Sequence, residues 1–260
     1  MAEILTTLEQ EQAEHAAMLE ALPSSLAVTV DLTISEGDVM FDATAPDRYL
    51  RAGANAYAAI KRLLTLHGKG QPENILDFGC GHGRVMRWLR AAWPTANIVG
   101  ADVGEAGVSF CAELFSSTEA VCGVDFDRLG PFAGQDLIWS GSVFTHLLET
   151  DSRRLFQHFR DWLVPGGIAL FSSHGRAAAR NMEWGTIDYT DGLGHDHLLR
   201  EFSSGRYGFT AYRETPNYGV SLIPSSYWYE SVGERADMRV SYFEQLWSGH
   251  HDIVALQRYN

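Results

Sequence analysis

Three closely spaced glycines follow directly on an apolar run in the segment ILDFGCGHGR, residues 75–84. Glycine adopts positive φ angles without strain and lets the backbone approach a ligand closely. A helix that begins after such a turn directs its free N–H groups at the same ligand. The pattern predicts a buried strand, a ligand-binding turn and a helix, an arrangement typical of proteins with a parallel sheet and connecting helices.

Alternation of strand and helix continues through the middle of the chain. Short apolar runs predict strands at 74–79, 96–102, 119–125, 135–142 and 167–174. Helical patterns lie between them at 83–93, 105–115 and 151–164. This succession predicts a parallel sheet with helices on both faces. Two last strands, 238–247 and 251–259, are joined by a short SGHH link and predict an antiparallel hairpin.

Two parts of the chain fall outside this alternation. Residues 1–70 contain helical patterns at 1–22 and 47–67, and we expect them to form an N-terminal helical lid. The remaining 71–260 form the core domain, which a segment at about 175–224 interrupts with many glycine, aromatic and histidine residues and no clear period. We expect this insertion to hold the substrate.

The charge balance excludes some partners. Acidic residues outnumber basic residues by 33 to 20, for a formal charge of −13. This argues against nucleic acid, which is bound through many Lys and Arg contacts to phosphate, and against anionic membranes. No apolar run approaches the roughly 20 residues that span a bilayer. The acidic N-terminus differs from a signal peptide, and three cysteines without a pairing pattern fit a reduced compartment. We expect a cytoplasmic protein.

Carboxylates accompany the ends of the first three predicted strands. Asp77 directly precedes the glycines, where it would repel a pyrophosphate but suits an ammonium group. The G-x-G-x-G spacing also departs from the G-x-G-x-x-G of dinucleotide-binding proteins, so a nicotinamide cofactor is disfavoured. Asp102 can accept hydrogen bonds from both hydroxyls of a ribose. Asp125 is either an acceptor for an adenine amino group, flanked by Phe126 or Val103, or a turn residue.

Four segments occur in a fixed order: LDFGCGHGR, IVGADV, DLIWSGSVFTHL and FRDWLVPGGIALFSSHG. Together they resemble the class I S-adenosylmethionine-dependent methyltransferases, over residues 47–174 and again at the C-terminal hairpin. Two of the segments are also similar to a bacterial subgroup that acts on small molecules or sugars. The resemblance implies an α/β fold, a Rossmann-like, doubly wound seven-strand sheet that is mostly parallel with a C-terminal antiparallel hairpin. S-adenosylmethionine would lie over the carboxyl ends of the first strands.

The resemblance also implies a cofactor site. Asp77 would contact the methionine and ribose portion, Asp102 the ribose hydroxyls, and Ser140 the methionine group. Arg51, on the helix that covers the cofactor, is either a partner of the cofactor's carboxylate or an exposed surface residue. The implied set is Tyr49, Arg51, Asp77, Gly79, Cys80, Gly81, Asp102, Val103, Asp125, Phe126 and Ser140.

The end of the fourth strand narrows the type of methyl transfer. Adenine and amide N-methyltransferases carry Asn/Asp-Pro-Pro-Tyr/Phe there, and this chain has SGSV at 140–143. His146 and His174 follow strand ends on the substrate side, and a neutral imidazole is suited to take a proton from a hydroxyl. The alternative for His146 is a helix-starting residue bound to the backbone. His250 and His251 belong to the hairpin turn and are expected to be exposed.

No metal site is expected. Catechol-type metal-dependent enzymes place an Asp at the end of the fourth strand, whereas Asp136 lies at its beginning. The loop DGLGHDH, residues 191–197, carries two histidines whose spacing would allow them to share an ion. A polar loop without a metal is the favoured interpretation.

These observations predict transfer of a methyl group to a small-molecule acceptor, with a hydroxyl of a sugar or natural-product intermediate as the favoured acceptor. Methyl transfer from a sulfonium requires in-line approach, so much of the protein's task is to orient the acceptor. The alternatives are a small-molecule N-methyltransferase and a non-catalytic partner protein that binds the cofactor. The sequence does not indicate an oligomeric state.

Overall fold

The structure is a computed structural model that describes residues 30–126, 129–130, 132–190, 192–233 and 235–259. The helix expected at 1–22 lies outside the described residues. The same holds for Asp191, in the loop considered for a metal ion. In the described part of the chain, no helix is long and apolar enough to cross a membrane.

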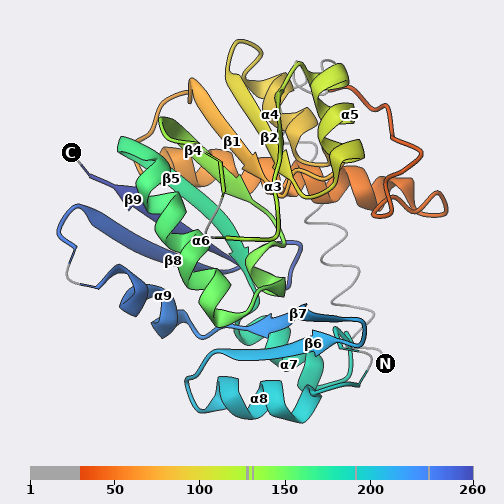
Figure 1. Ribbon diagram of the computed structural model, residues 1–260, viewed down its shortest axis with the longest axis vertical. Coiled ribbons are helices and arrows are strands. Elements are labelled where there is room, and N and C mark those ends of the chain that lie inside the picture. The colour runs from red at the N-terminus through yellow and green to blue at the C-terminus, as the bar shows by residue number, and fades with distance from the viewer. Residues whose placement is uncertain (1–29, 127–128, 131, 191, 234, 260) are drawn as a thin grey trace.

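A seven-stranded sheet forms the centre of the molecule and confirms the predicted fold class (Figure 1). Its strands are β1 (Asn74–Phe78), β2 (Asn97–Asp102), β3 (Thr118–Val121), β4 (Gln135–Ser140), β5 (Leu163–Ser173), β8 (Met238–Trp247) and β9 (His251–Arg258). The spatial order is β3-β2-β1-β4-β5-β9-β8. The first five strands are parallel, and β9 runs antiparallel to both β5 and β8. The C-terminal hairpin therefore closes one edge of the sheet, as predicted.

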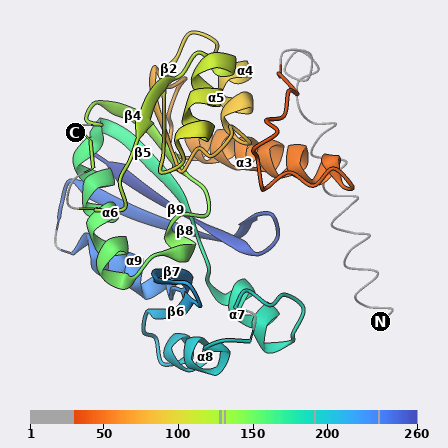
Figure 2. The same cartoon turned by 45° about the vertical axis from the view of Figure 1, so that its right-hand side comes forward.

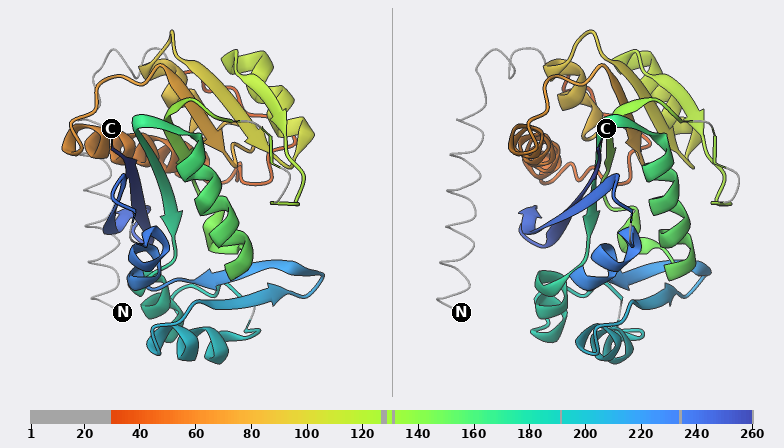
Figure 3. Two further views of the ribbon diagram at one scale, coloured as in Figure 1. Left: turned by 60° about the vertical axis from the view of Figure 1, so that its left-hand side comes forward. Right: turned by 90° about the vertical axis from the view of Figure 1, so that its left-hand side faces the viewer.

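Helices cover both faces of this sheet. The helices α3 (Pro46–Leu66), α4 (Met86–Ala92) and α5 (Glu105–Phe115) share one apolar cluster, and α6 (Glu149–Trp162) and α9 (Ser225–Val232) share another. Neighbouring strand residues alternate between the two clusters, because side chains along a strand point to opposite faces. Ile75 packs in the first cluster and Leu76 in the second. Figure 3 shows α3 and α6 on opposite sides of the sheet.

The segment at 175–224 is more regular than its sequence indicated. It forms α7 (Arg176–Glu183), α8 (His195–Ser203) and a two-stranded antiparallel sheet of β6 (Gly208–Tyr212) and β7 (Thr215–Leu222). These elements have an apolar cluster of their own, which includes Met182 and Leu198. The cluster is small and its helices are short, so no single window shows a long period. Figures 1 and 2 show the four elements grouped beyond the end of β5.

One strand boundary differs from the prediction in a way that affects the site. The third strand was expected to run to Asp125, but β3 ends at Val121. The amide of Cys122 still donates to the carbonyl of Asp102, at 2.8 Å. Asp125 therefore lies in the loop after β3 and not at a strand end.

Candidate functional site

The glycine turn after β1 has the tight geometry that its sequence predicts. Gly79 has a φ of 83°, and a Cβ there would lie 2.4 Å from Cγ2 of Val143. The amides of Gly79 and Cys80 both donate to the carbonyl of Ala101 on β2, at 2.7 and 3.1 Å. Only glycine fits such a position without strain. The turn thus brings the ends of β1, β2 and β4 together.

Asp102 ties the end of β2 to this turn. Its Oδ2 accepts a hydrogen bond from the amide of Gly81 at 2.8 Å, and its Oδ1 accepts one from the amide of Gly104 at 2.9 Å. An ionised carboxylate has about four lone-pair directions for hydrogen bonds. Asp102 can therefore orient the turn and still accept a hydrogen bond from a ligand hydroxyl.

Asp77 is buried at the end of β1, and its Oδ2 has no hydrogen-bond partner among the described residues. Burial, and after it the charge of Asp102, raises the pKa of its carboxyl to about 7 against the opposing charge of Arg84. A buried carboxylate without donors is costly unless a ligand supplies the partner. The unsatisfied oxygen therefore fits a ligand that carries a cationic nitrogen, such as the ammonium group of a methionine.

Arg84 is a site residue that the sequence analysis missed. Its guanidinium lies 6.0 Å from the ring centre of Tyr49 and 5.8 Å from that of Trp247. Its positive charge acts on Asp77, as the pKa of Asp77 shows. Arg51, for which the sequence left open a partner of the cofactor's carboxylate or an exposed surface residue, is half-buried on α3. The sequence did contain a signal for Arg84, because this basic residue directly follows Gly83, the third glycine of the turn.

A cavity of about 670 Å³ opens at this edge of the sheet. Its lining includes five predicted residues, namely Gly79, Asp102, Val103, Asp125 and Phe126. Residues 214–218, at the β6–β7 turn and the start of β7, also line the cavity. They belong to the segment that was expected to hold the substrate, and their place beside the predicted cofactor residues was not expected. A cavity of this size suits a nucleoside-sized ligand.

The other predicted cofactor residues lie around this cavity and do not line it. The Cys80 side chain is buried in the apolar cluster, near Cys111. Ser140 is fully buried, and its Oγ has no hydrogen-bond partner among the described residues. Tyr49 is buried and donates its hydroxyl hydrogen to Asp38, in the segment that precedes α3.

His146 is the last residue of the 3-10 helix η1 (Phe144–His146), which follows β4. The alternative that it starts a helix is therefore wrong, although its predicted bond to the backbone is observed. Its Nδ1 donates to the carbonyl of Gly219 at 2.7 Å, and its ring stacks on Tyr218 at 5.0 Å. Burial lowers the pKa of His146, so the ring is neutral near pH 7. Because Nδ1 carries the proton, Nε2 carries the lone pair.

His174 lies directly after β5 and is buried. Neither of its ring nitrogens has a hydrogen-bond partner among the described residues. The expectation that the hairpin-turn histidines are exposed is wrong, because His251 is buried and His250 half-buried against His174. The antiparallel pairing of β5 with β9 brings them there.

The two histidines at 191–197 do not face each other. His195 and His197 both belong to the first turn of α8. Residues two apart on a helix point in different directions. A shared ion at this pair is not supported by the geometry.

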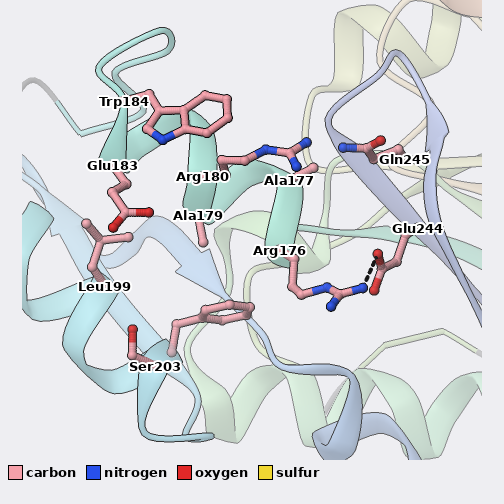
Figure 4. A pocket seen from close by; sticks show the side chains of 11 residues that line it. Arg176, Ala177, Ala179, Arg180, Glu183, Trp184, Leu199, Ser203, Glu244 and Gln245 are labelled. Carbon is pink, nitrogen blue, oxygen red and sulfur yellow. Dashed lines mark hydrogen bonds and ion pairs between the residues drawn. The ribbon is translucent and has the colours of Figure 1, made fainter.

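A second cavity, of about 550 Å³, lies between α7, α8 and the end of β8. Arg176 forms an ion pair with Glu244 at 2.7 Å across it. Figure 4 shows this pair, with Arg180 and the indole of Trp184 on the other side of the lining. The guanidinium of Arg180 lies 5.3 Å from the Trp184 ring centre. The cavity therefore offers charged groups of both signs and an exposed aromatic face.

Comparisons with known proteins agree with this geometry. Residues 48–207 match the family model described as a methyltransferase domain. The chain is 32% identical over 122 residues to the trans-aconitate 2-methyltransferase of Klebsiella pneumoniae, a match that covers 47% of each protein. It is 27% identical over 148 residues to a malonyl-[acyl-carrier protein] O-methyltransferase of Ilyobacter polytropus, covering 53% of this chain and 56% of the relative. The chain thus spans about half the length of these curated relatives.

Solved structures show the same fold over nearly the whole chain. The plantazolicin methyltransferase BpumL, in complex with SAH, superimposes with a TM-score of 0.58 at 13% identity, covering 97% of this chain and 99% of that one. A methyltransferase from Clostridium acetobutylicum superimposes with a TM-score of 0.56 at 12% identity, covering 84% and 98%.

Proposed function

Because the chain belongs to the methyltransferase-domain family, we propose that it transfers the methyl group of S-adenosylmethionine to a small-molecule acceptor. The observation that carries this proposal is the buried Asp77 carboxyl, whose Oδ2 has no partner in the described structure, beside the glycine turn and Asp102. A nucleoside-sized cavity adjoins these groups. An amino-acid portion with a cationic nitrogen, joined to a ribose and a base, matches this series of groups.

Each part of the cofactor has a proposed partner. The carboxylate of Asp102 accepts hydrogen bonds from the ribose hydroxyls, and Asp77 accepts them from the ammonium group. Asp125, Phe126 and Val103 surround the adenine in the cavity. We assign the cofactor's carboxylate to Arg84 and not to Arg51, because Arg84 lies near Asp77. When bound, S-adenosylmethionine supplies the methyl group and its own leaving group.

We assign the proton transfer to His146. The hydrogen bond to Gly219 fixes its ring and leaves Nε2 as the basic nitrogen. The ring stacks on Tyr218, which lines the cofactor cavity. A neutral imidazole at this place is suited to take a proton from an acceptor hydroxyl. His174 lies beside His250 and His251, and we assign it to the part of the site that binds the methyl acceptor.

The acceptor is proposed to be a hydroxyl-bearing sugar or natural-product intermediate. The second cavity gives it an aromatic face at Trp184 and charged partners at Arg176 and Arg180. Aromatic faces with polar neighbours suit sugar rings and other cyclic metabolites. Oxygen as the methylated atom is supported by relatives that are named O-methyltransferases.

Calorimetric titration with S-adenosylmethionine and S-adenosylhomocysteine tests the proposal. We expect micromolar binding, about −8 kcal/mol, and a loss of at least about tenfold in affinity for Asp102→Asn, which removes one charged acceptor. Asp161→Asn, on the exposed surface of α6, is the matched control and should bind as the natural chain does. A folded protein that binds neither compound would refute the proposal.

A further inference from the structure

Three histidines that are distant in the sequence meet beyond the end of β5. Ser173 of β5 pairs with Asp252 of β9 in an antiparallel register, so His174 lies opposite His251. The β8–β9 turn adds His250, whose ring centre lies 6.4 Å from that of His174 and 4.3 Å from that of His251. His174 directly follows β5, and His251 is the first residue of β9, so the main sheet positions both of them.

Their nitrogens converge. One ligand nitrogen from each histidine lies within 4.8 Å of those of the other two. Both ring nitrogens of His174 and Nδ1 of His251 are buried and make no hydrogen bond of ordinary geometry among the described residues, with the backbone of Ser221 near the His174 ring. Buried polar atoms are normally satisfied, so three unsatisfied nitrogens at one place point to a missing partner.

The third histidine is already oriented for the same task. Nδ1 of His250 donates to the carbonyl of Ser248 at 2.7 Å. That bond fixes the proton on Nδ1 and leaves the lone pair on Nε2. A backbone carbonyl that receives the other ring N–H is the usual outer partner of a metal-binding histidine.

Two of the three rings are enclosed by the protein. His174 is 3% exposed and His251 is 8% exposed. A metal ion binds the lone pair of a neutral imidazole, and burial of a side chain disfavours its charged form.

We propose that His174, His250 and His251 bind one divalent transition-metal ion. Three imidazoles suit zinc and related ions better than magnesium or calcium, which prefer oxygen. Zinc bonds of about 2.0–2.1 Å in a tetrahedral site place the nitrogens roughly 3.4 Å apart, so modest side-chain rotations close the site. Three protein ligands leave a fourth position for water or an oxygen of a ligand.

The site faces the acceptor side of the proposed enzyme. The ring of His251 packs against Trp247 at 4.8 Å, and Trp247 in turn packs against Trp139 at 5.4 Å. A Cβ on Gly141, in the cofactor cavity, would lie 2.9 Å from the Trp247 ring. Trp247 thus separates the histidines from the cofactor edge. The metal proposal stands on its ligands alone and does not depend on the methyl acceptor.

Metal binding to the untagged, chelator-treated chain tests the proposal. Equilibrium dialysis against zinc, followed by elemental analysis, should give one ion per chain. His250→Ala and His251→Gln should each weaken zinc binding by at least about tenfold, in line with the loss of one of three ligands. His197→Ala, which removes an exposed histidine on α8, should leave it unchanged.

Cobalt substitution separates this site from the three cysteines of the chain. Bound cobalt should give visible absorption without an intense near-ultraviolet thiolate band, and His250→Ala should abolish it. Folding of each variant is checked by its affinity for S-adenosylhomocysteine, which should not change. Sub-stoichiometric zinc in the natural chain, or unchanged affinity in both folded variants, would overturn the metal site without touching the proposed methyl transfer.

Discussion

Two buried carboxylates lie at the same end of the main sheet and differ in what surrounds them. Asp252, at the start of β9, accepts hydrogen bonds from the Tyr242 hydroxyl and, at 2.7 Å, from the amide of Gln245. Asp77, at the end of β1, has an oxygen with no partner in the described structure. Burial raises the pKa of both carboxyls. Only one of them is satisfied by the protein itself.

This contrast assigns Asp252 to the stability of the fold and Asp77 to ligand binding. Asp252 ties Tyr242 and Gln245 of the β8–β9 hairpin together, and Gly175 packs so closely on it that a Cβ there would lie 2.0 Å from its Oδ2. We expect an uncharged residue at position 77 to serve the fold at least as well as Asp77, because the buried Oδ2 has no partner in the described structure. Buried carboxyls with a strongly raised pKa are typical of binding and catalytic sites. Substitutions at four positions test whether the fold and the ligand depend on different residues at this end of the sheet.

The largest effect is expected at Asp252. Asp252→Ala leaves the Tyr242 hydroxyl and the Gln245 amide without an acceptor, and should lower the free energy of unfolding by about 4 kcal/mol. Asp252→Asn is the matched control. It keeps an oxygen for Gln245 and should cost less than half as much. Urea denaturation measures both, and equal losses would contradict the structural role of these hydrogen bonds.

Asp77 should behave in the opposite way. Its folded pKa of about 7 exceeds the ordinary value of 3.8, so the native state keeps a proton that the unfolded chain releases. The free energy of unfolding therefore has its full value below the ordinary pKa of 3.8 and falls as the pH rises through about 7. Asp77→Asn stays neutral at every pH. Its free energy of unfolding, relative to that of the natural chain, should therefore rise by on the order of 3 kcal/mol from about pH 5 to about pH 8.

The same substitution should weaken binding of S-adenosylhomocysteine at about pH 8, because the ammonium group loses its charged partner. Urea denaturation at two pH values and calorimetry on the same samples give both quantities. A variant that is no more stable at alkaline pH would show that the carboxylate is solvated. In that case the comparison with Asp252 fails.

A substitution of Arg84 tests only the proposed contact with the carboxylate of the cofactor's amino-acid portion. Arg84→Met keeps an unbranched apolar side chain between Tyr49 and Trp247 but removes the charge. Affinity for S-adenosylhomocysteine should fall about tenfold, or about 1.4 kcal/mol. Affinity for methylthioadenosine, which lacks the amino-acid carboxylate, should stay within about twofold. Arg51→Met is the control. If it shows the larger loss, the assignment of the carboxylate returns to Arg51.

The cofactor edge was predictable because its parts are local. The glycine turn, Asp77 and Asp102 lie at the ends of neighbouring strands, and the strand–helix alternation fixes their arrangement. The histidine cluster was not predictable, because the pairing of β5 with β9 brings His174 to His251 across the chain. The contribution of residues 214–218 to the cavity wall was missed for the same reason. Local pattern thus predicted the residues at the ends of β1 and β2, whereas long-range packing brings the histidines and residues 214–218 into place.

The smallest effect is expected at His146, which joins the two sides. His146→Phe keeps a ring to stack on Tyr218 but loses the hydrogen bond to Gly219. The carbonyl of Gly219 loses its imidazole donor, so the free energy of unfolding should fall by about 1 kcal/mol. Hydrogen exchange should quicken in β6 and β7 but not in α3. Affinity for S-adenosylhomocysteine should remain unchanged, because His146 is proposed to act on the acceptor's proton. If His146→Phe loses affinity for S-adenosylhomocysteine while hydrogen exchange in β6 and β7 stays normal, His146 contacts the cofactor. In that case η1 belongs with the cofactor residues and not with the acceptor residues.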